Sequence, residues 1–254
     1  MSSDAELHAA YKVANAPLNT FPYPHLYVTD IFPPDFYQTL QAMLPTPADM
    51  RPIAEVRPVK GYKERFVLDL GSDQVASLPQ SKQAFWQQMR SWLIAGRFSS
   101  VVAAKFSKEL NRRFGAEPAE FYDEALLVQD VTNYSLGPHT DAPRKVITLL
   151  FYLPKDESQK HLGTSLYMPK DPAFACAGGP HYPHANFDRV WTMPFMPNAL
   201  FAFAKTDRSF HGVEPIADED CRRWLLLYDV YLHKNQPAAS QTASAAPGKA
   251  KFSF

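Results

Sequence analysis

Apolar runs in the second half of the chain predict a fold in which strands dominate. Short apolar runs bounded by turn residues are typical of buried strands. Such runs extend from Lys145 to Leu153, from Met196 to Phe203 after an opening turn, and from Arg222 to Tyr231. A further strand is predicted from Leu162 to Pro169, and Leu126 to Tyr134 leads into this region. The pattern indicates an α+β protein that is mainly β.

The first half of the chain carries the helical periodicity. Pro33 and Pro34 open a predicted helix that runs to about Leu44, since proline suits a first helical turn. The longest helical pattern spans Ser81 to Phe114, where Gly96 can divide it and Gly115 suits a C-terminal cap. Its aromatic and aliphatic stripe predicts helices packed on the outside of a sheet.

Two shorter strands are predicted before the long helical region. Residues 21–30 read as an edge strand because they contain prolines, and we interpret His25 within them as structural. Residues 64–70 alternate as a strand of the outer sheet. Arg65, in that strand, could face a substrate, but we expect a solvated or ion-paired surface arginine.

Length and composition bound the organisation of the protein. The 254 residues suffice for one large domain, which we expect at 21–235 with its core at about 126–232, after a leader at 1–20. Residues 236–254 are rich in alanine, serine and proline and predict a disordered tail. Two cysteines, Cys176 and Cys221, favour a reducing compartment over a disulfide framework.

Charge and hydropathy narrow the classes of partner. The formal net charge is zero, which argues against bulk attraction to nucleic acid or an acidic membrane. No secretory signal is visible at the N-terminus, and no apolar run approaches the roughly 20 residues that span a bilayer. We therefore expect a cytoplasmic protein with no nucleic-acid or membrane partner, and the sequence does not indicate an oligomeric state.

One short segment carries the clearest candidate chemistry. His139 and Asp141 lie two residues apart, so in a strand both side chains point to the same face. His211 follows about seventy residues later, between two apolar runs. Two histidines and one carboxylate form the facial triad of non-haem Fe(II) oxygenases and leave three coordination positions open. A histidine and an aspartate at this spacing are weak evidence alone, so the wider pattern has to support them.

With its neighbours, this pattern resembles the Fe(II)- and 2-oxoglutarate-dependent oxygenases, and specifically their prolyl 4-hydroxylase-like branch. The resemblance covers roughly 126–232. It includes His139-x-Asp141, the strand around Thr148 that ends in Tyr152-Leu153, the Gly163-Thr164 element, and His211-x-Val213-x-Pro215 followed by an arginine in a strand. Where the branch often has Gly-Gly-x-Thr, this chain has Leu162-Gly163-Thr164. The resemblance implies a double-stranded β-helix, a jelly-roll or cupin-like core, with N-terminal helices on its major sheet.

The resemblance also implies roles for particular residues. His139, Asp141 and His211 would bind iron, and Arg223 would hold the far carboxylate of 2-oxoglutarate with help from Tyr152. Thr148 belongs to the same cofactor-binding strand. Because a buried carboxylate needs a paired charge and adjacent strand residues point oppositely, only one of Arg222 and Arg223 can serve, and we choose Arg223.

The implied activity is hydroxylation of an unactivated C–H bond with Fe(II), 2-oxoglutarate and O2, releasing succinate and CO2. Halogenases of this superfamily lack the carboxylate ligand, so Asp141 favours hydroxylation. The substrate would be a peptide or a small metabolite. Two alternatives stay open, a non-catalytic cupin-like metal- or ligand-binding protein and a metal-independent structural β-sandwich, and an arginine after His211 favours the enzyme.

Two further features have alternative interpretations. Tyr134 precedes His139 by five residues and either contacts cosubstrate or substrate or packs at the mouth of the pocket. The long insertion at 170–195 contains Cys176, His181 and His184. It could hold a second metal, but a stable zinc site normally has four ligands, so we favour a lid or substrate loop.

Overall fold

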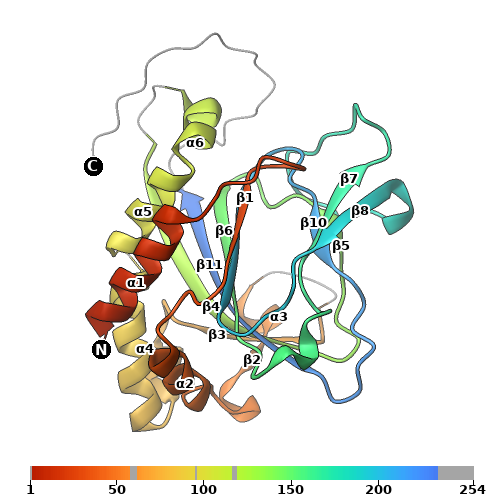
Figure 1. Cartoon of the computed structure of the whole chain (residues 1–254). Coiled ribbons are helices and arrows are strands. Elements are labelled where there is room, and N and C mark those ends of the chain that lie inside the picture. Colours follow the sequence, from red (N-terminus) through yellow and green to blue (C-terminus); the bar gives the residue numbers. More distant parts are fainter. Residues whose placement is uncertain (1, 58–61, 95, 116–118, 234–254) are drawn as a thin grey trace.

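The computed structural model describes residues 2–57, 62–94, 96–115 and 119–233 (Figure 1). The expected tail at 236–254 and the last two residues of the expected domain lie outside them. The helices are α1 (Ser2–Asn15), α2 (Pro34–Ala42), α3 (Ile53–Val56), α4 (Gln80–Leu93), α5 (Arg97–Lys105) and α6 (Ser107–Phe114), with four short 3-10 turns, at Pro47–Asp49, Asp73–Ser77, Glu157–Gln159 and His184–Asn186.

The strands form two antiparallel sheets. They are β1 (His25–Val28), β2 (Arg51–Pro52), β3 (Arg65–Asp69), β4 (Phe121–Val131), β5 (Leu136–His139), β6 (Lys145–Tyr152), β7 (Ser165–Pro169), β8 (Phe187–Thr192), β9 (Ala199–Ala204), β10 (His211–Val213) and β11 (Arg222–Leu232). The larger sheet has the order β1-β9-β6-β11-β4-β3-β2, and the smaller has the order β5-β10-β7-β8. The protein is therefore mainly β with helices, as the sequence predicted.

The larger sheet is buried on both faces, which explains why its central strands are continuous apolar runs. All eight residues of β6 are buried. Alternate residues of this strand contribute to different clusters, because side chains in a strand alternate between faces. Ile147, Leu149 and Phe151 pack towards the helices, whereas Leu150 and Tyr152 pack on the opposite face.

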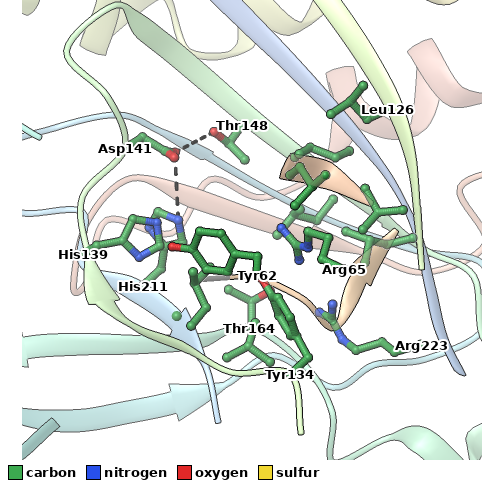
Figure 2. Close-up of a pocket in the computed structure, with 18 of the residues that line it drawn as sticks. Tyr62, Arg65, Leu126, Tyr134, His139, Asp141, Thr148, Thr164, His211 and Arg223 are labelled. Carbon is green, nitrogen blue, oxygen red and sulfur yellow. Dashed lines mark hydrogen bonds and ion pairs between the residues drawn. The ribbon is translucent and has the colours of Figure 1, made fainter. Parts of the chain in front are cut away.

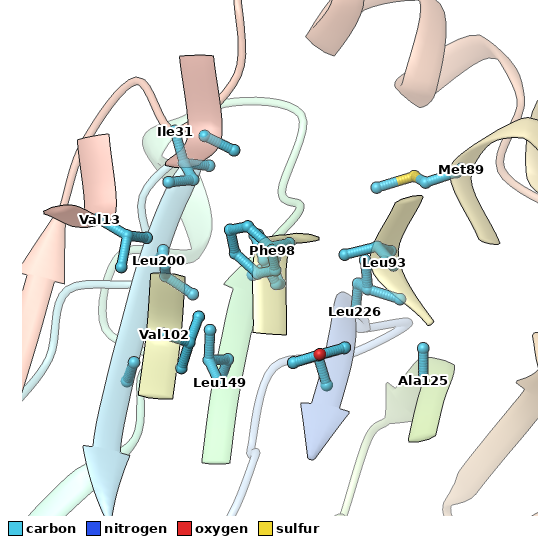
Figure 3. Close-up of a cluster of buried hydrophobic side chains, with 14 of the residues drawn as sticks. Val13, Ile31, Met89, Leu93, Phe98, Val102, Ala125, Leu149, Leu200 and Leu226 are labelled. Atoms are coloured by element: carbon cyan, nitrogen blue, oxygen red, sulfur yellow. The ribbon is translucent and has the colours of Figure 1, made fainter. Parts of the chain in front are cut away.

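Helices cover one face of the larger sheet, and the smaller sheet lies on its other side (Figure 1). The core between helices and sheet contains Phe98 and Val102 of α5, Met89 and Leu93 of α4, and sheet residues such as Leu226 (Figure 3). Gly96 separates α4 from α5, and Gly115 caps α6 with a φ of 68°. The predicted helical region is thus present and divided at Gly96 as the sequence indicated. A second division, at Phe106 between α5 and α6, was not predicted.

The N-terminal residues belong to this helical layer. The segment that we expected as a leader forms α1, which packs on α5. Ala5, Ala9 and Val13 recur on one face of α1 and are 1% exposed or less. Small side chains buried at every fourth position let α1 pack close to its neighbours. The sequence did not reveal this face, because the helix is only weakly amphipathic.

Other predicted elements are present with shorter bounds. The strand predicted at 21–30 is β1, at an edge of the larger sheet as its prolines required. The helix predicted from the double proline is α2, and the strand at 64–70 is β3. None of the helices among the described residues is both long and apolar enough to cross a bilayer.

Candidate active site

Two neighbouring strands of the smaller sheet bring the predicted triad together. His139 ends β5 and His211 begins β10, and the two residues are direct partners in the antiparallel register. Gly212 permits this pairing, since a Cβ there would lie 2.3 Å from the backbone oxygen of Leu136. The potential ligand atoms of His139, Asp141 and His211 all lie within 4.8 Å of one another, and all three residues are buried.

Backbone hydrogen bonds orient both imidazoles. Nδ1 of His139 bonds to the Gly137 carbonyl at 3.0 Å, and Nδ1 of His211 bonds to the Ser209 carbonyl at 3.0 Å. A carbonyl can only accept, so each Nδ1 carries the proton and each Nε2 presents a lone pair. This is the tautomer in which histidine binds a metal through Nε2.

Asp141 is held by contacts to both of its carboxylate oxygens. Thr148 donates its hydroxyl hydrogen to Oδ2 at 2.8 Å, and Nζ of Lys145 lies 3.1 Å from Oδ1. Nε2 of His211 is 3.9 Å from Oδ2. The Lys145 ammonium thus pairs with Oδ1 of Asp141, whereas Oδ2 faces the imidazoles.

The electrostatics keep the triad in the form that binds a cation. Burial lowers the pKa of both His139 and His211, and Asp141 only partly offsets this, so both imidazoles are neutral near pH 7. Burial alone would raise the pKa of Asp141, but Lys145 and the two imidazoles outweigh it and hold the pKa below its ordinary range. Neutral imidazoles and an ionised carboxylate are the protonation states that metal binding requires.

The triad opens onto a cavity of about 190 Å³ between the two sheets. Its floor is the apolar inner face of the larger sheet, which includes Leu126, Val128, Leu150, Leu225 and Leu227. Figure 2 shows the triad on one side of this pocket and the guanidinium groups of Arg65 and Arg223 on the other. The pocket therefore joins a cluster of potential metal ligands to a basic end.

Arg223 is the member of the arginine pair that faces inward. It is 1% exposed and lines the pocket, whereas Arg222 is exposed. Nε of Arg223 donates to the Leu162 carbonyl at 2.6 Å and Nη1 donates to Oδ2 of Asp130 at 2.6 Å. Its guanidinium also lies 4.6 Å from the centre of the Phe195 ring.

Arg65 corrects the sequence-based expectation of a surface arginine. Its side chain is 13% exposed, lines the pocket and forms two hydrogen bonds to Asp130, from Nε at 2.6 Å and from Nη2 at 2.9 Å. The reason lies in the register, which sets Arg65 of β3 and Arg223 of β11 on either side of Asp130 in β4. Burial alone would lower the pKa of Arg65, but Asp130 raises it, so the guanidinium stays charged.

The predicted cofactor residues take different positions around the pocket. Thr148 and Tyr134 line the cavity. The Tyr134 ring lies under the Arg65 guanidinium at 4.4 Å, and its hydroxyl, buried and without a hydrogen-bond partner among the described residues, has its pKa raised by burial. Tyr152 is buried beside the cavity without lining it, and its hydroxyl accepts a hydrogen bond from the Thr164 backbone N–H at 3.2 Å.

The insertion contributes one side chain to the pocket. His181 lines the cavity, and its ring centre lies 4.5 Å from that of His139. The Tyr62 hydroxyl lies 3.0 Å from the ring nitrogens of His181, and Tyr62 lies across the pocket between triad and basic end (Figure 2). Among the described residues, Cys176, His181 and His184 form no cluster close enough for a metal.

Sequence reasoning missed residues that line the pocket and buried acids that pair with its lining residues. Asp130 interrupts an apolar strand, and Asp229 does the same in β11, where it lies 3.0 Å from Lys145. A carboxylate inside a buried strand requires a cation, so each signalled a buried ion pair. Tyr62 and Arg57, in contrast, come from an irregular region whose sequence gave no signal of a place at the pocket.

The donor set fits a divalent transition metal. Two neutral imidazoles and one carboxylate suit Fe(II), and such a triad leaves coordination positions open to other ligands. At the opposite end, the hydroxyls of Tyr134 and Thr164 are buried without partners among the described residues, and both residues line the pocket beside Arg223. These unpaired donors and the guanidinium suit a carboxylate.

No family model matches the sequence, and no curated protein matches it either. Among solved structures, similar chains include a prolyl 4-hydroxylase from Phytophthora capsici, with 13% identity and a TM-score of 0.49 over 92% of this chain and 66% of that one. A prolyl-4-hydroxylase from Pseudomonas putida is similar with 13% identity and a TM-score of 0.45, over 90% of this chain and 99% of that one.

Proposed function

We propose that this protein is an Fe(II)- and 2-oxoglutarate-dependent dioxygenase that hydroxylates an unactivated C–H bond of a peptide or small molecule. The observation that carries the proposal is the buried cluster of His139, Asp141 and His211 at one end of a cavity whose other end holds Arg223. The two ends supply what an oxo acid with a second carboxylate needs, a metal for the first and a guanidinium for the second.

The order of strands supports a double-stranded β-helix. The smaller sheet β5-β10-β7-β8 opposes the central strands β9-β6-β11-β4 of the larger sheet, and the cavity lies between them. Closed antiparallel β architectures of this kind enclose ligand cavities. The helices lie on the outer face of the larger sheet, on the side away from the cavity.

Each residue then has a defined part. His139, Asp141 and His211 would hold Fe(II), which when bound supplies the oxidation of substrate by O2 coupled to conversion of 2-oxoglutarate to succinate and CO2. Thr148 and Lys145 hold the Asp141 carboxylate in place. Arg223, with the hydroxyls of Tyr134 and Thr164, would bind the far carboxylate of the oxo acid, and the apolar floor excludes water from its carbon chain.

The substrate would reach the metal from the side of Tyr62 and His181. Both residues line the pocket, their ring centres lie 5.8 Å apart, and the His181 ring centre lies 4.5 Å from that of His139. His181 is an exposed residue, so the insertion that carries it can contact both solvent and pocket. This placement supports a substrate loop in the first part of the insertion, residues 170–186. The expected bounds were too wide, because Phe187–Thr192 form β8 and pair with β7.

The test is Fe(II)-dependent release of succinate from 2-oxoglutarate. We expect release by the wild-type protein, its loss in Asp141→Ala, and its retention in the control His161→Ala, which alters a surface histidine with a 58% exposed side chain. Binding of Fe(II), Mn(II) or Co(II) should disappear together with activity in Asp141→Ala. Metal binding without any binding of 2-oxoglutarate would instead favour a non-catalytic cupin-like protein.

A further inference from the structure

The basic end of the pocket contains an acid that an anion-binding site would not be expected to have. Asp130 is fully buried, at 0% exposure, and accepts hydrogen bonds from two guanidinium groups. Arg65 takes both of its oxygens, through Nε and Nη2, while Arg223 shares only Oδ2. The two contacts are therefore unequal, and Arg65 is the principal partner of Asp130.

The balance of charge at this end depends on Arg65. Two guanidinium groups and one carboxylate leave one positive charge in excess, enough for one further carboxylate. Among the described residues, the other charged side chains that line the cavity have their own partners, Lys145 with Asp141 and Asp229, and Arg57 with Glu124. Without Arg65, Asp130 and Arg223 would neutralise each other, and a second carboxylate would enter a site with no net charge.

We infer that Arg65 is a positioning residue that satisfies Asp130 and thereby keeps the charge of Arg223 for the far carboxylate of an oxo-dicarboxylic acid. This inference rests on the proposed function and adds a residue outside the strands that carry the triad. Tyr134 supports the arrangement, because its ring packs against the Arg65 guanidinium at 4.4 Å while its buried hydroxyl finds no hydrogen-bond partner in the described part of the chain. Arg65 thus acts on the ligand through Asp130.

The effect should depend on the second carboxylate of the ligand. 2-Oxoglutarate carries it, whereas 2-oxopentanoate has the same carbon chain without it. Arg65→Met should weaken binding of 2-oxoglutarate to the Mn(II)-loaded protein by about 10- to 100-fold, the range for a lost interaction with a charged group. Binding of 2-oxopentanoate should change less than about threefold. A general distortion of the pocket would weaken both ligands alike.

The decisive experiment removes the acid as well. Asp130→Asn keeps the shape of the side chain and deletes its charge, so in the double variant Arg65→Met/Asp130→Asn we expect affinity for 2-oxoglutarate to return to within a few fold of wild type. Asp130→Asn alone should bind 2-oxoglutarate at least as tightly as wild type. That single variant tests the inference even where Arg65→Met does not fold, and thermal unfolding establishes which variants are folded.

Isothermal titration of the Mn(II)-loaded protein distinguishes the outcomes. Unchanged affinity in Arg65→Met, weaker binding in Asp130→Asn, or a double variant as weak as Arg65→Met would each overturn the inference about Arg65 and leave the proposed function intact. A wild-type protein that binds Mn(II) but no 2-oxoglutarate would overturn the proposed function, and this inference with it.

Discussion

Replacement of Lys145 by methionine should destabilise the metal-free protein through two carboxylates at once. The Lys145 side chain is 11% exposed, and its Nζ lies 3.1 Å from Asp141 and 3.0 Å from Asp229. Burial lowers the pKa of this ammonium, but the two carboxylates raise it overall, so Lys145 is charged at neutral pH. Methionine keeps most of the side-chain volume and removes only the charge.

The expected loss is about 3–5 kcal/mol at pH 8, the range for removing one partner from a buried ion pair. Asp229 should contribute most of it, because its side chain is 2% exposed and burial already raises its pKa. Protonation of Asp229 relieves the uncompensated charge, so the loss should shrink as the pH falls from 8 to 5. Asp141 is affected less, because Thr148 donates a hydrogen bond to it at 2.8 Å, whereas the Tyr231 hydroxyl donates to Asp229 at the longer distance of 3.3 Å.

Urea unfolding of metal-free protein at pH 5 and pH 8 measures both effects. The control is Lys145→Met/Asp229→Asn, which removes the unpaired negative charge of Asp229. It should recover more than half of the lost free energy of unfolding at pH 8. Saturating Mn(II) should raise the melting temperature of Lys145→Met more than that of wild type, because the ion replaces the missing positive charge beside Asp141. Equal stability of Lys145→Met and wild type at pH 8 would refute the electrostatic account.

Three further changes test the scaffold. Asn198→Ala should lower the urea unfolding free energy by about 2–4 kcal/mol, because the buried Asn198 amide bonds to the backbone N–H and C=O of Phe32 and its φ is 56°. Burial lowers the pKa of His25, so the unfolded chain binds a proton at a higher pH than the folded chain does. Stability is therefore lost as the pH falls below about 6.5. His25→Asn should make unfolding free energy less steep between pH 7 and 5, by up to about 1.4 kcal/mol per pH unit. Gly163→Ala should yield little soluble protein, since its Cβ would lie 1.5 Å from a backbone oxygen, whereas Gly71→Ala, at 3.2 Å from a side-chain oxygen, should fold.

The local parts of the fold were predictable because their signals are local. The double proline before α2, the glycines at 96 and 115 and the apolar run of β6 each act within a few residues. The triad was accessible only in part. The short spacing of His139 and Asp141 pointed to a shared pocket, but β5 ends at His139, so Asp141 lies just beyond the strand. Its carboxylate is held instead by Thr148 and Lys145 of β6.

Contacts that depend on the register between distant strands were not predictable. Arg65 precedes Asp130 by 65 positions, and only the alignment of β3 with β4 shows that the two residues are partners. The sequence therefore left two directions open for Arg65, towards a substrate or towards the surface, and the surface was expected. The helix α1 was missed for a related reason, since alanines on one face mark a helix only once a second helix is known to pack there.

The pairing of His139 with His211 in register has a consequence for how well the folded chain resists unfolding. A cation bound at the triad would cross-link two strands that are 72 positions apart in sequence, and it would close the loop between them, much as a disulfide does. Removal of that cation by a chelator would remove the cross-link between β5 and β10. The smaller sheet would then become the first part of the molecule that proteases can cleave.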